Sequence, residues 1–219
     1  MKTKGMGIAL LSAAALLGSA VAQAELPWTY GELGYSMADG EDDFETDAGD
    51  IKASIGFAEM WHASLQYTDG TSEQGSLGDI DFDGYRLIAG AHPQITPNTQ
   101  LVGDLTYFDY DLDGAEGFSS GTDGFGVGLG LRHSISDKLE VMSEVWYVNG
   151  DTDGSFFSSD SVDYNDTTVE FGGRYNWMPQ LSTGLTVNLN GAPGGVTSYV
   201  SGDTIRFDVR WSFLGDVSK

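Results

Sequence analysis

Apolar and polar residues alternate along the chain in ten short stretches, most sharply near the C-terminus. There Ile205, Phe207, Val209, Trp211 and Phe213 share one face, and the residues between them are polar. Because side chains of a β-strand point to opposite sides with a period of two, this segment predicts a strand between an oily and a polar medium. The same alternation predicts strands over residues 28–37, 50–57, 61–68, 80–91, 99–108, 124–132, 139–148, 167–177, 183–190 and 203–213.

Short and long connections alternate between these predicted strands. The short ones are 58–60, 92–98, 133–138 and 178–182, and the long ones are 38–49, 69–79, 109–123, 149–166 and 191–202. Bacterial outer-membrane barrels join their strands by short periplasmic turns and long external loops. We therefore predict an all-β fold, a transmembrane up-and-down antiparallel barrel of ten strands, with eight strands as the alternative.

The first 24 residues are typical of a secretory signal peptide. Lys2 and Lys4 precede an apolar run over 8–21, and Ala22-Gln23-Ala24 is a small-x-small cleavage site. We expect residues 25–219 to form one outer-membrane domain. The chain has no cysteine and a net charge of −23 at pH 7, which argues against a nucleic-acid partner because phosphate binding needs a basic surface.

Aromatic residues gather at the ends of the predicted strands. Tyr and Trp favour the lipid–water interface, where the ring and its polar tip each find a suitable solvent. We predict two aromatic girdles formed by Trp28, Trp61, Tyr67, Tyr85, Tyr107, Tyr147, Trp177 and Trp211. The alternative is that aromatic residues simply favour strands.

The polar faces of the strands carry six basic and six acidic residues, separated by small residues such as Gly126 and Gly128. A ten-stranded barrel encloses little more space than side chains fill, and unpaired charge there is costly. We predict a mostly plugged lumen with an ion network of Glu32, Lys52, Arg86, Asp104, Arg132, Glu140, Glu144, Glu170, Arg174, Arg206, Asp208 and Arg210. A narrow hydrated pore lined by both signs is the alternative.

With its export signal, alternating strands, aromatic strand ends and acidic loops, the chain resembles the small outer-membrane β-barrels of the OmpX, opacity-protein and OmpA-barrel group. Such proteins end in a strand whose alternate aromatic residues are read by the barrel assembly machinery, and Phe207, Trp211 and Phe213 are similar to that signal. The chain departs from the pattern because residues 214–219 follow the last aromatic residue. The resemblance implies a monomer in contact with outer-membrane lipids, lipopolysaccharide and the assembly machinery.

The predicted external loops hold most of the acidic residues, including two stretches of the form D-x-D-x-D-G. These stretches contain Asp79, Asp81 and Asp83, and Asp109, Asp111 and Asp113. They match the first half of a calcium loop, but position twelve is Gly90 or Ser120 and not Glu, which argues against an EF-hand. Strand pairing through turn 92–98 would bring the six aspartates together. They either share Ca²⁺ or Mg²⁺ or form a solvated acidic rim.

No catalytic constellation stands out in the sequence. Of the three histidines, His92 and His133 fall at short turns, and His62 faces the lumen far from the acidic loops. We therefore expect a structural or surface-interaction role and no enzyme. The alternatives are a narrow cation-preferring porin, an outer-membrane enzyme, and a soluble exported barrel with its apolar face inside.

Overall fold

The computed structural model describes residues 28–40, 44–74, 78–114, 119–154, 162–189 and 202–213. The predicted signal peptide and the segment 214–219 lie outside these ranges. Among the described residues, no helix is long and apolar enough to cross a membrane. The strands are β1 (Tyr30–Gly40), β2 (Phe44–Phe57), β3 (Trp61–Gln74), β4 (Gly78–Ala91), β5 (Gln94–Thr96), β6 (Thr99–Gly114), β7 (Ser119–Ser134), β8 (Leu139–Gly154), β9 (Val162–Met178), β10 (Leu181–Leu189) and β11 (Gly202–Ser212).

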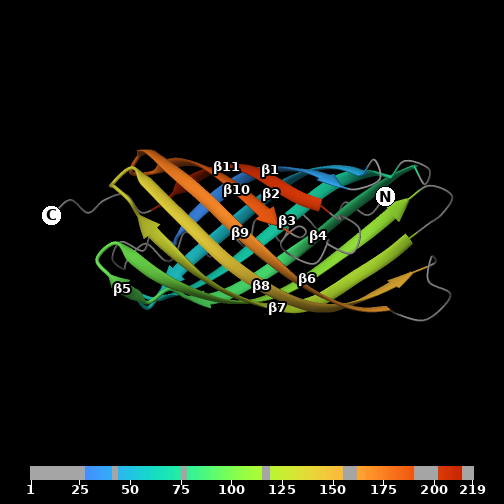
Figure 1. The fold of residues 1–219 in the computed structure, drawn as a ribbon, viewed down its shortest axis with the longest axis horizontal. Helices are drawn as coiled ribbons and strands as arrows, with labels where there is room; N and C mark the ends of the chain where they lie inside the picture. Colours follow the sequence, from blue (N-terminus) through green and yellow to red (C-terminus); the bar gives the residue numbers. More distant parts are fainter. Residues whose placement is uncertain are drawn as a thin grey trace.

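Ten of these strands form a closed antiparallel barrel (Figure 1). Each long strand pairs with its neighbours in sequence, and β1 pairs with β11 to close the sheet. The short strand β5 lies in the connection between β4 and β6, which also pair directly with each other. The ten-strand prediction is therefore confirmed, and the eight-strand alternative is wrong.

The apolar face of the alternation points away from the barrel axis. Leu105 is 64% exposed and Phe125 is 67% exposed, whereas inward neighbours such as Thr106 are buried. In a bilayer every backbone polar group must be satisfied within the protein, and a closed barrel with an apolar outer band meets that condition. The chain is thus an outer-membrane barrel, and the soluble alternative with an apolar interior does not describe this band.

The barrel has two distinct ends. At the turn end, tight connections over 58–60, 92–98, 135–138 and 179–180 join the strands. At the opposite loop end, the strands run well past the tyrosines predicted to mark the lipid boundary. Since outer-membrane barrels keep their short connections on the periplasmic side, we assign the turn end to the periplasm.

The strands are longer at the loop end than the alternation predicted. The segments 69–79, 109–123 and 149–166, expected as loops, are largely strand. The expectation was wrong because the polarity of the two faces inverts beyond the tyrosines, so an apolar outer face no longer marks the strand. On β6, Leu105 and Tyr107 point outward below this boundary, whereas above it Phe108 points inward and is fully buried.

Candidate functional site: the barrel lumen

A single cross-strand row places charges and glycines alternately on the lumen wall. Asp50 on β2 lies opposite Gly34 on β1, and Gly34 lies opposite Asp208 on β11. Asp208 then faces Gly184 on β10, and Gly184 faces Arg174 on β9. A β-carbon at Gly34 would meet the Asp50 carboxylate and the Arg206 guanidinium. Glycine is therefore required here so that large ionic side chains from neighbouring strands can meet above it.

Glu32 on β1 is the centre of the resulting ion network. Its carboxylate accepts hydrogen bonds from Arg174 Nη2 at 3.1 Å, Arg206 Nη2 at 2.9 Å and Arg210 Nε at 2.7 Å. Asp208 pairs with Arg174 at 2.6 Å and with Arg206 at 3.3 Å. We define the lumen network as Glu32, Asp50, Arg174, Arg206, Asp208 and Arg210.

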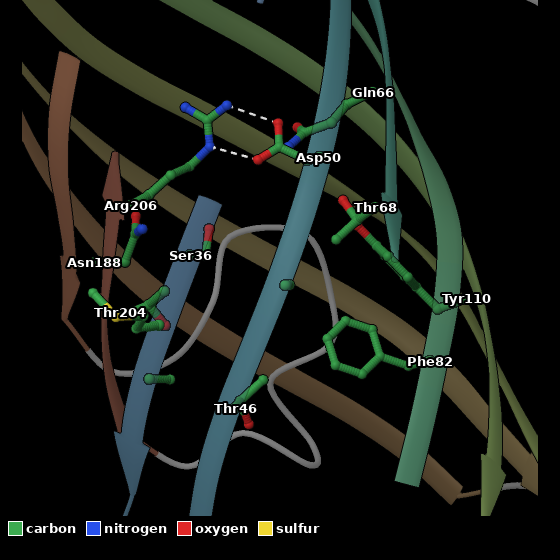
Figure 2. Close-up of a pocket in the computed structure, with 13 residues that line it drawn as sticks. Ser36, Thr46, Asp50, Gln66, Thr68, Phe82, Tyr110, Asn188, Thr204 and Arg206 are labelled. Carbon is green, nitrogen blue, oxygen red and sulfur yellow. Dashed lines mark hydrogen bonds and ion pairs between the residues drawn. The ribbon is translucent and has the colours of Figure 1, made fainter. Parts of the chain in front are cut away.

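Arg206 also binds Asp50 with both ends of its guanidinium (Figure 2). Nε lies 2.9 Å from Oδ2, and Nη2 lies 2.7 Å from Oδ1. Such bidentate pairs are the strongest of the charge-assisted hydrogen bonds. Because the lumen network holds three arginines and three carboxylates, its formal charges cancel, which offsets the cost of removing them from water.

Smaller polar contacts continue around the wall. Arg132 Nε lies 2.6 Å from Glu140 Oε1, and His62 Nε2 lies 3.3 Å from Asp104 Oδ1. Arg86 on β4 donates to Thr106 and stacks 4.2 Å above the Trp146 ring on β8. These contacts connect strands β3 to β8, on the part of the wall that the lumen network does not cover.

Four of the predicted network residues lie outside these ion pairs. Lys52, Arg86, Glu144 and Glu170 form no ion pair with another residue in the described ranges. Glu144 and Glu170 lie directly opposite each other on β8 and β9. The lumen wall therefore carries two facing glutamate side chains, without an ion pair to another described residue, next to the charge-compensated lumen network.

Asp50 is a network residue that the sequence analysis missed. It falls at the first position of the predicted strand 50–57, where the alternation had begun with Ile51 on the apolar face. Asp50 lies two residues before Lys52 and therefore on the same, inward face of the strand. Because the predicted strand started at Asp50, the sequence analysis treated Asp50 as a strand end and did not assign it to the lumen. In the structure β2 begins at Phe44, and Asp50 is 8% exposed on its inward face.

Trp28 is the one girdle residue that the structure places elsewhere. Its indole is 9% exposed and stacks 4.2 Å from the His62 ring and 4.3 Å from the His92 ring. The girdle prediction for Trp28 is wrong because Trp28 precedes β1 and turns into the barrel, with Arg132 5.0 Å above its ring. It lies inside the barrel at the turn end.

The remaining predicted girdle residues lie on the outer face at the strand ends. Trp61, Trp177 and Trp211 mark the turn end, and each is about half exposed or more. Toward the loop end, Tyr85 and Tyr147 are also exposed, and Tyr67 and Tyr107 are half-buried on the same face. The predicted assembly-signal residues Phe207 and Phe213 point outward as well.

Apolar side chains gather in the lumen beyond the tyrosines. Phe108 and Leu112 on β6 are essentially inaccessible, and Phe82 on β4 packs with them. The cluster is completed by Ala38, Ala48, Ile80, Tyr110 and Val148. The sequence analysis missed this cluster. Ala38, Ala48, Tyr110 and Leu112 fall in segments that it assigned to loops, and Ile80, Phe82, Phe108 and Val148 lie at the ends of predicted strands, on the face expected to be polar.

The six predicted metal-site aspartates line the outer face of β4 and β6 beyond the tyrosines. Asp81 lies opposite Asp113, and Asp83 lies opposite Asp111. The row continues on the flanking strands as Asp69, Asp123, Asp151 and Asp163. We call this surface the acidic wall. Among the described residues, no three His, Cys, Asp or Glu side chains converge to hold a metal ion, so the predicted Ca²⁺ or Mg²⁺ ligand set is not preformed there.

Hydrogen bonds tie the acidic wall to the tyrosines below it. The Tyr85 hydroxyl donates to Asp109 at 3.0 Å, and the Tyr67 hydroxyl donates to Asp83 at 3.1 Å. Partial burial, followed by the nearby carboxylates of Asp109 and Asp83, raises the pKa of Asp111. The wall therefore concentrates negative charge directly above the lipid boundary.

No protein-family model matches the chain, and no curated protein matches it significantly in sequence. Among solved structures, the translocator domain of autotransporter NalP from Neisseria meningitidis is similar, with a TM-score of 0.54, 13% identity, and coverage of 95% of this chain and 97% of that chain. The KdgM porin has a TM-score of 0.45 at 14% identity, covering 84% of this chain and 99% of that chain. The NanC porin has a TM-score of 0.47 at 10% identity, and the match covers 84% of this chain and 100% of that chain. The likeness to NalP concerns the fold.

Proposed function

We propose that this protein is a side-chain-filled outer-membrane barrel with a structural or surface-interaction role, and that it does not conduct solutes in its resting state. The observation that carries the proposal is the lumen network, which joins side chains from β1, β2, β9 and β11 by six ion pairs. A solute would have to separate buried, mutually compensating charges to pass, and breaking such pairs is costly.

Apolar packing supports the same proposal on the loop-end side. The rings of Phe82, Phe108 and Tyr110 occupy the lumen where a porin would present an aqueous vestibule. At the turn end, Trp28 and its two histidines add a second layer. Together with the lumen network, these groups support a lumen obstructed by side chains at three heights.

Conductance across a planar lipid bilayer tests this proposal. Residues 25–219 would be refolded into detergent, and heat-modifiable migration on gels would verify folding. The folded protein is expected to give no steady single-channel steps. Arg206→Ala, which removes three of the six ion pairs of the lumen network, is expected to give brief openings. Steady steps from the unchanged protein would overturn the proposal.

A narrow, cation-preferring channel is the second candidate. It is favoured by Glu144 and Glu170, which face each other on the lumen wall without an ion pair to another described residue. Rings of carboxylates give pores their preference for cations. If steps are seen, Glu170→Gln would reduce the cation preference measured from the reversal potential in a salt gradient.

The acidic wall is our proposed surface for contact with outer-membrane lipid and lipopolysaccharide. Carboxylates just beyond the girdle of tyrosines lie at the height of phosphorylated lipid headgroups. Divalent cations would be needed to bridge the aspartate carboxylates and the lipid phosphates, because both are negatively charged. Calorimetric titration of Ca²⁺ into the protein in lipopolysaccharide-containing and lipopolysaccharide-free micelles tests this contact. Equal heats in both micelles would contradict it. The proposal includes no catalytic role.

A further inference from the structure

A cavity of about 70 Å³ lies in the lumen between the lumen network and the apolar cluster (Figure 2). Asn188 on β10 and Thr204 on β11 line one side of it, and Phe82 and Tyr110 line the other. The Arg206–Asp50 pair forms its floor toward the turn end. Strands from opposite parts of the barrel thus contribute polar and aromatic walls to one partly open cavity.

Two polar side chains at this cavity lack hydrogen-bond partners among the described residues. Asn188 is 1% exposed, and neither its Nδ2 nor its Oδ1 is paired. Thr204 is 4% exposed, and its Oγ1 is also unpaired. Buried amides and hydroxyls nearly always form hydrogen bonds, because a buried polar group without a partner has lost its hydrogen bonds to water. These three atoms therefore point to a guest that supplies both donors and acceptors.

The charges at the cavity restrict the chemistry of that guest. Arg206 is fully engaged with Asp50, Glu32 and Asp208, and Asp50 is engaged with Arg206. The lining therefore offers no free counter-charge, and an anion or cation would have to break the bidentate pair to gain one. Thr46, on the same wall, already donates to Ser72 at 2.9 Å. The free groups are all neutral, so the guest is neutral.

The volume of the cavity and the residues that line it further restrict the chemical class of the guest. A water molecule needs roughly 10–15 Å³ of this kind of volume, so the cavity holds about five to seven non-hydrogen atoms. Hydroxyl groups both donate and accept, which matches an amide beside a threonine hydroxyl. The Phe82 ring opposite provides an apolar surface for C–H groups. A three-carbon polyol has these properties together.

We propose that the lumen contains a binding site for a small neutral polyol of glycerol size, held by Asn188 and Thr204 against Phe82. This site goes beyond the proposed function, because a closed barrel requires no ligand and a ligand at this position does not require conduction. Binding inside the barrel would satisfy the three unpaired atoms and leave the lumen network intact.

The test is side-chain amide NMR of asparagine-labelled protein refolded in detergent micelles. The signal lost in Asn188→Leu identifies Asn188, and glycerol is then titrated into the unchanged protein. The Asn188 signal is expected to shift saturably, whereas sodium glycerate, of similar size but charged, is expected to leave it in place. Thr204→Val should weaken glycerol binding at least several-fold while keeping the Asn188 signal visible.

Thr186→Val is the matched control, because Thr186 is a buried, inward threonine on β10 that does not line the cavity. It should leave glycerol binding unchanged. Small, linear shifts of all asparagine signals in folded protein would overturn the proposal, because polyols at high concentration act on the whole surface by preferential exclusion. A saturable shift that survives Thr204→Val would also overturn it. If Asn188→Leu fails to fold, Asn188→Asp provides the assignment.

Discussion

Gly184 on β10 lies directly opposite Asp208 on β11, and a β-carbon at Gly184 would meet the Asp208 carboxylate and lie 2.9 Å from Arg174 Nη2. Gly184→Ala should therefore push the Asp208–Arg174 pair apart and destabilise the barrel by about 1–3 kcal/mol, as overpacking generally does. Denaturant unfolding in lipid vesicles measures this change. Gly103→Ala is the control, since a β-carbon there meets nothing within 4 Å, and equal effects of the two variants would contradict the prediction.

Removing the central carboxylate should cost more than crowding the network. Glu32→Gln leaves Arg174, Arg206 and Arg210 with one carboxylate fewer, and loss of one partner from a buried ion pair typically costs about 3–5 kcal/mol. We expect a corresponding fall in the free energy of unfolding in vesicles. Glu73→Gln, on the exposed outer face of β3, should change it by less than about 0.5 kcal/mol. A Glu32 variant as stable as the Glu73 variant would show that the network is not a stabilising element.

Truncation of two phenylalanines on adjacent strands should destabilise the barrel to different extents. Phe108→Ala opens a cavity in the lumen cluster and should destabilise the barrel by about 3–5 kcal/mol. Phe125 is 67% exposed on the lipid-facing side of β7, so Phe125→Ala removes a lipid contact without leaving an internal void. The free energy of unfolding of both variants is measured in vesicles of one lipid composition. A larger loss of this free energy for Phe125→Ala would contradict the prediction that the side chains of the lumen form the packed core.

The acidic wall should make stability depend on pH. The folded state raises the pKa of Asp111 above its ordinary value of about 3.9, so the folded protein binds more protons there than the unfolded chain. This contribution is favourable below that ordinary value and is lost as the pH rises through the raised pKa. Asp111→Asn should therefore stabilise the barrel at neutral pH and lose this advantage in acid. Unfolding midpoints measured across acidic and neutral pH test the sign, and an advantage that grows in acid would contradict it.

The membrane-spanning part of the fold could be predicted because lipid enforces the alternation. Every apolar outward residue between the Trp and Tyr positions obeys a period of two, and the ten strands follow from counting such segments. Beyond Tyr107 the outside is water, so the rule reverses and Asp109 becomes the outward residue while Phe108 is enclosed. The sequence analysis assumed that the outward face of each strand is apolar along its whole length. It therefore ended the strands where that face becomes acidic and assigned the loop-end segments to loops.

The sequence predicted which charged residues face the lumen, but it did not predict which of them form ion pairs with each other. The alternation along the strands placed Glu32, Arg206 and Asp208 on the inward face. Which of them form contacts depends on the register between β1 and β11 and on the space that Gly34 and Gly184 leave. Trp28 shows another limit, since parity is undefined before the first strand begins. Its position follows from stacking with His62 and His92, which are distant in sequence.

The inversion of polarity along β4 and β6 also fixes the depth of the protein in its bilayer. If the barrel rose by two residues, the lipid-facing Leu105 and Leu87 would leave the hydrocarbon. If it sank by two, Asp109 and Asp83 would enter the hydrocarbon. Both displacements carry a penalty that grows with each strand, because the boundary recurs around much of the wall. A membrane whose hydrocarbon layer is thicker or thinner than this band is therefore expected to deform around the protein, because sliding the barrel would carry these penalties.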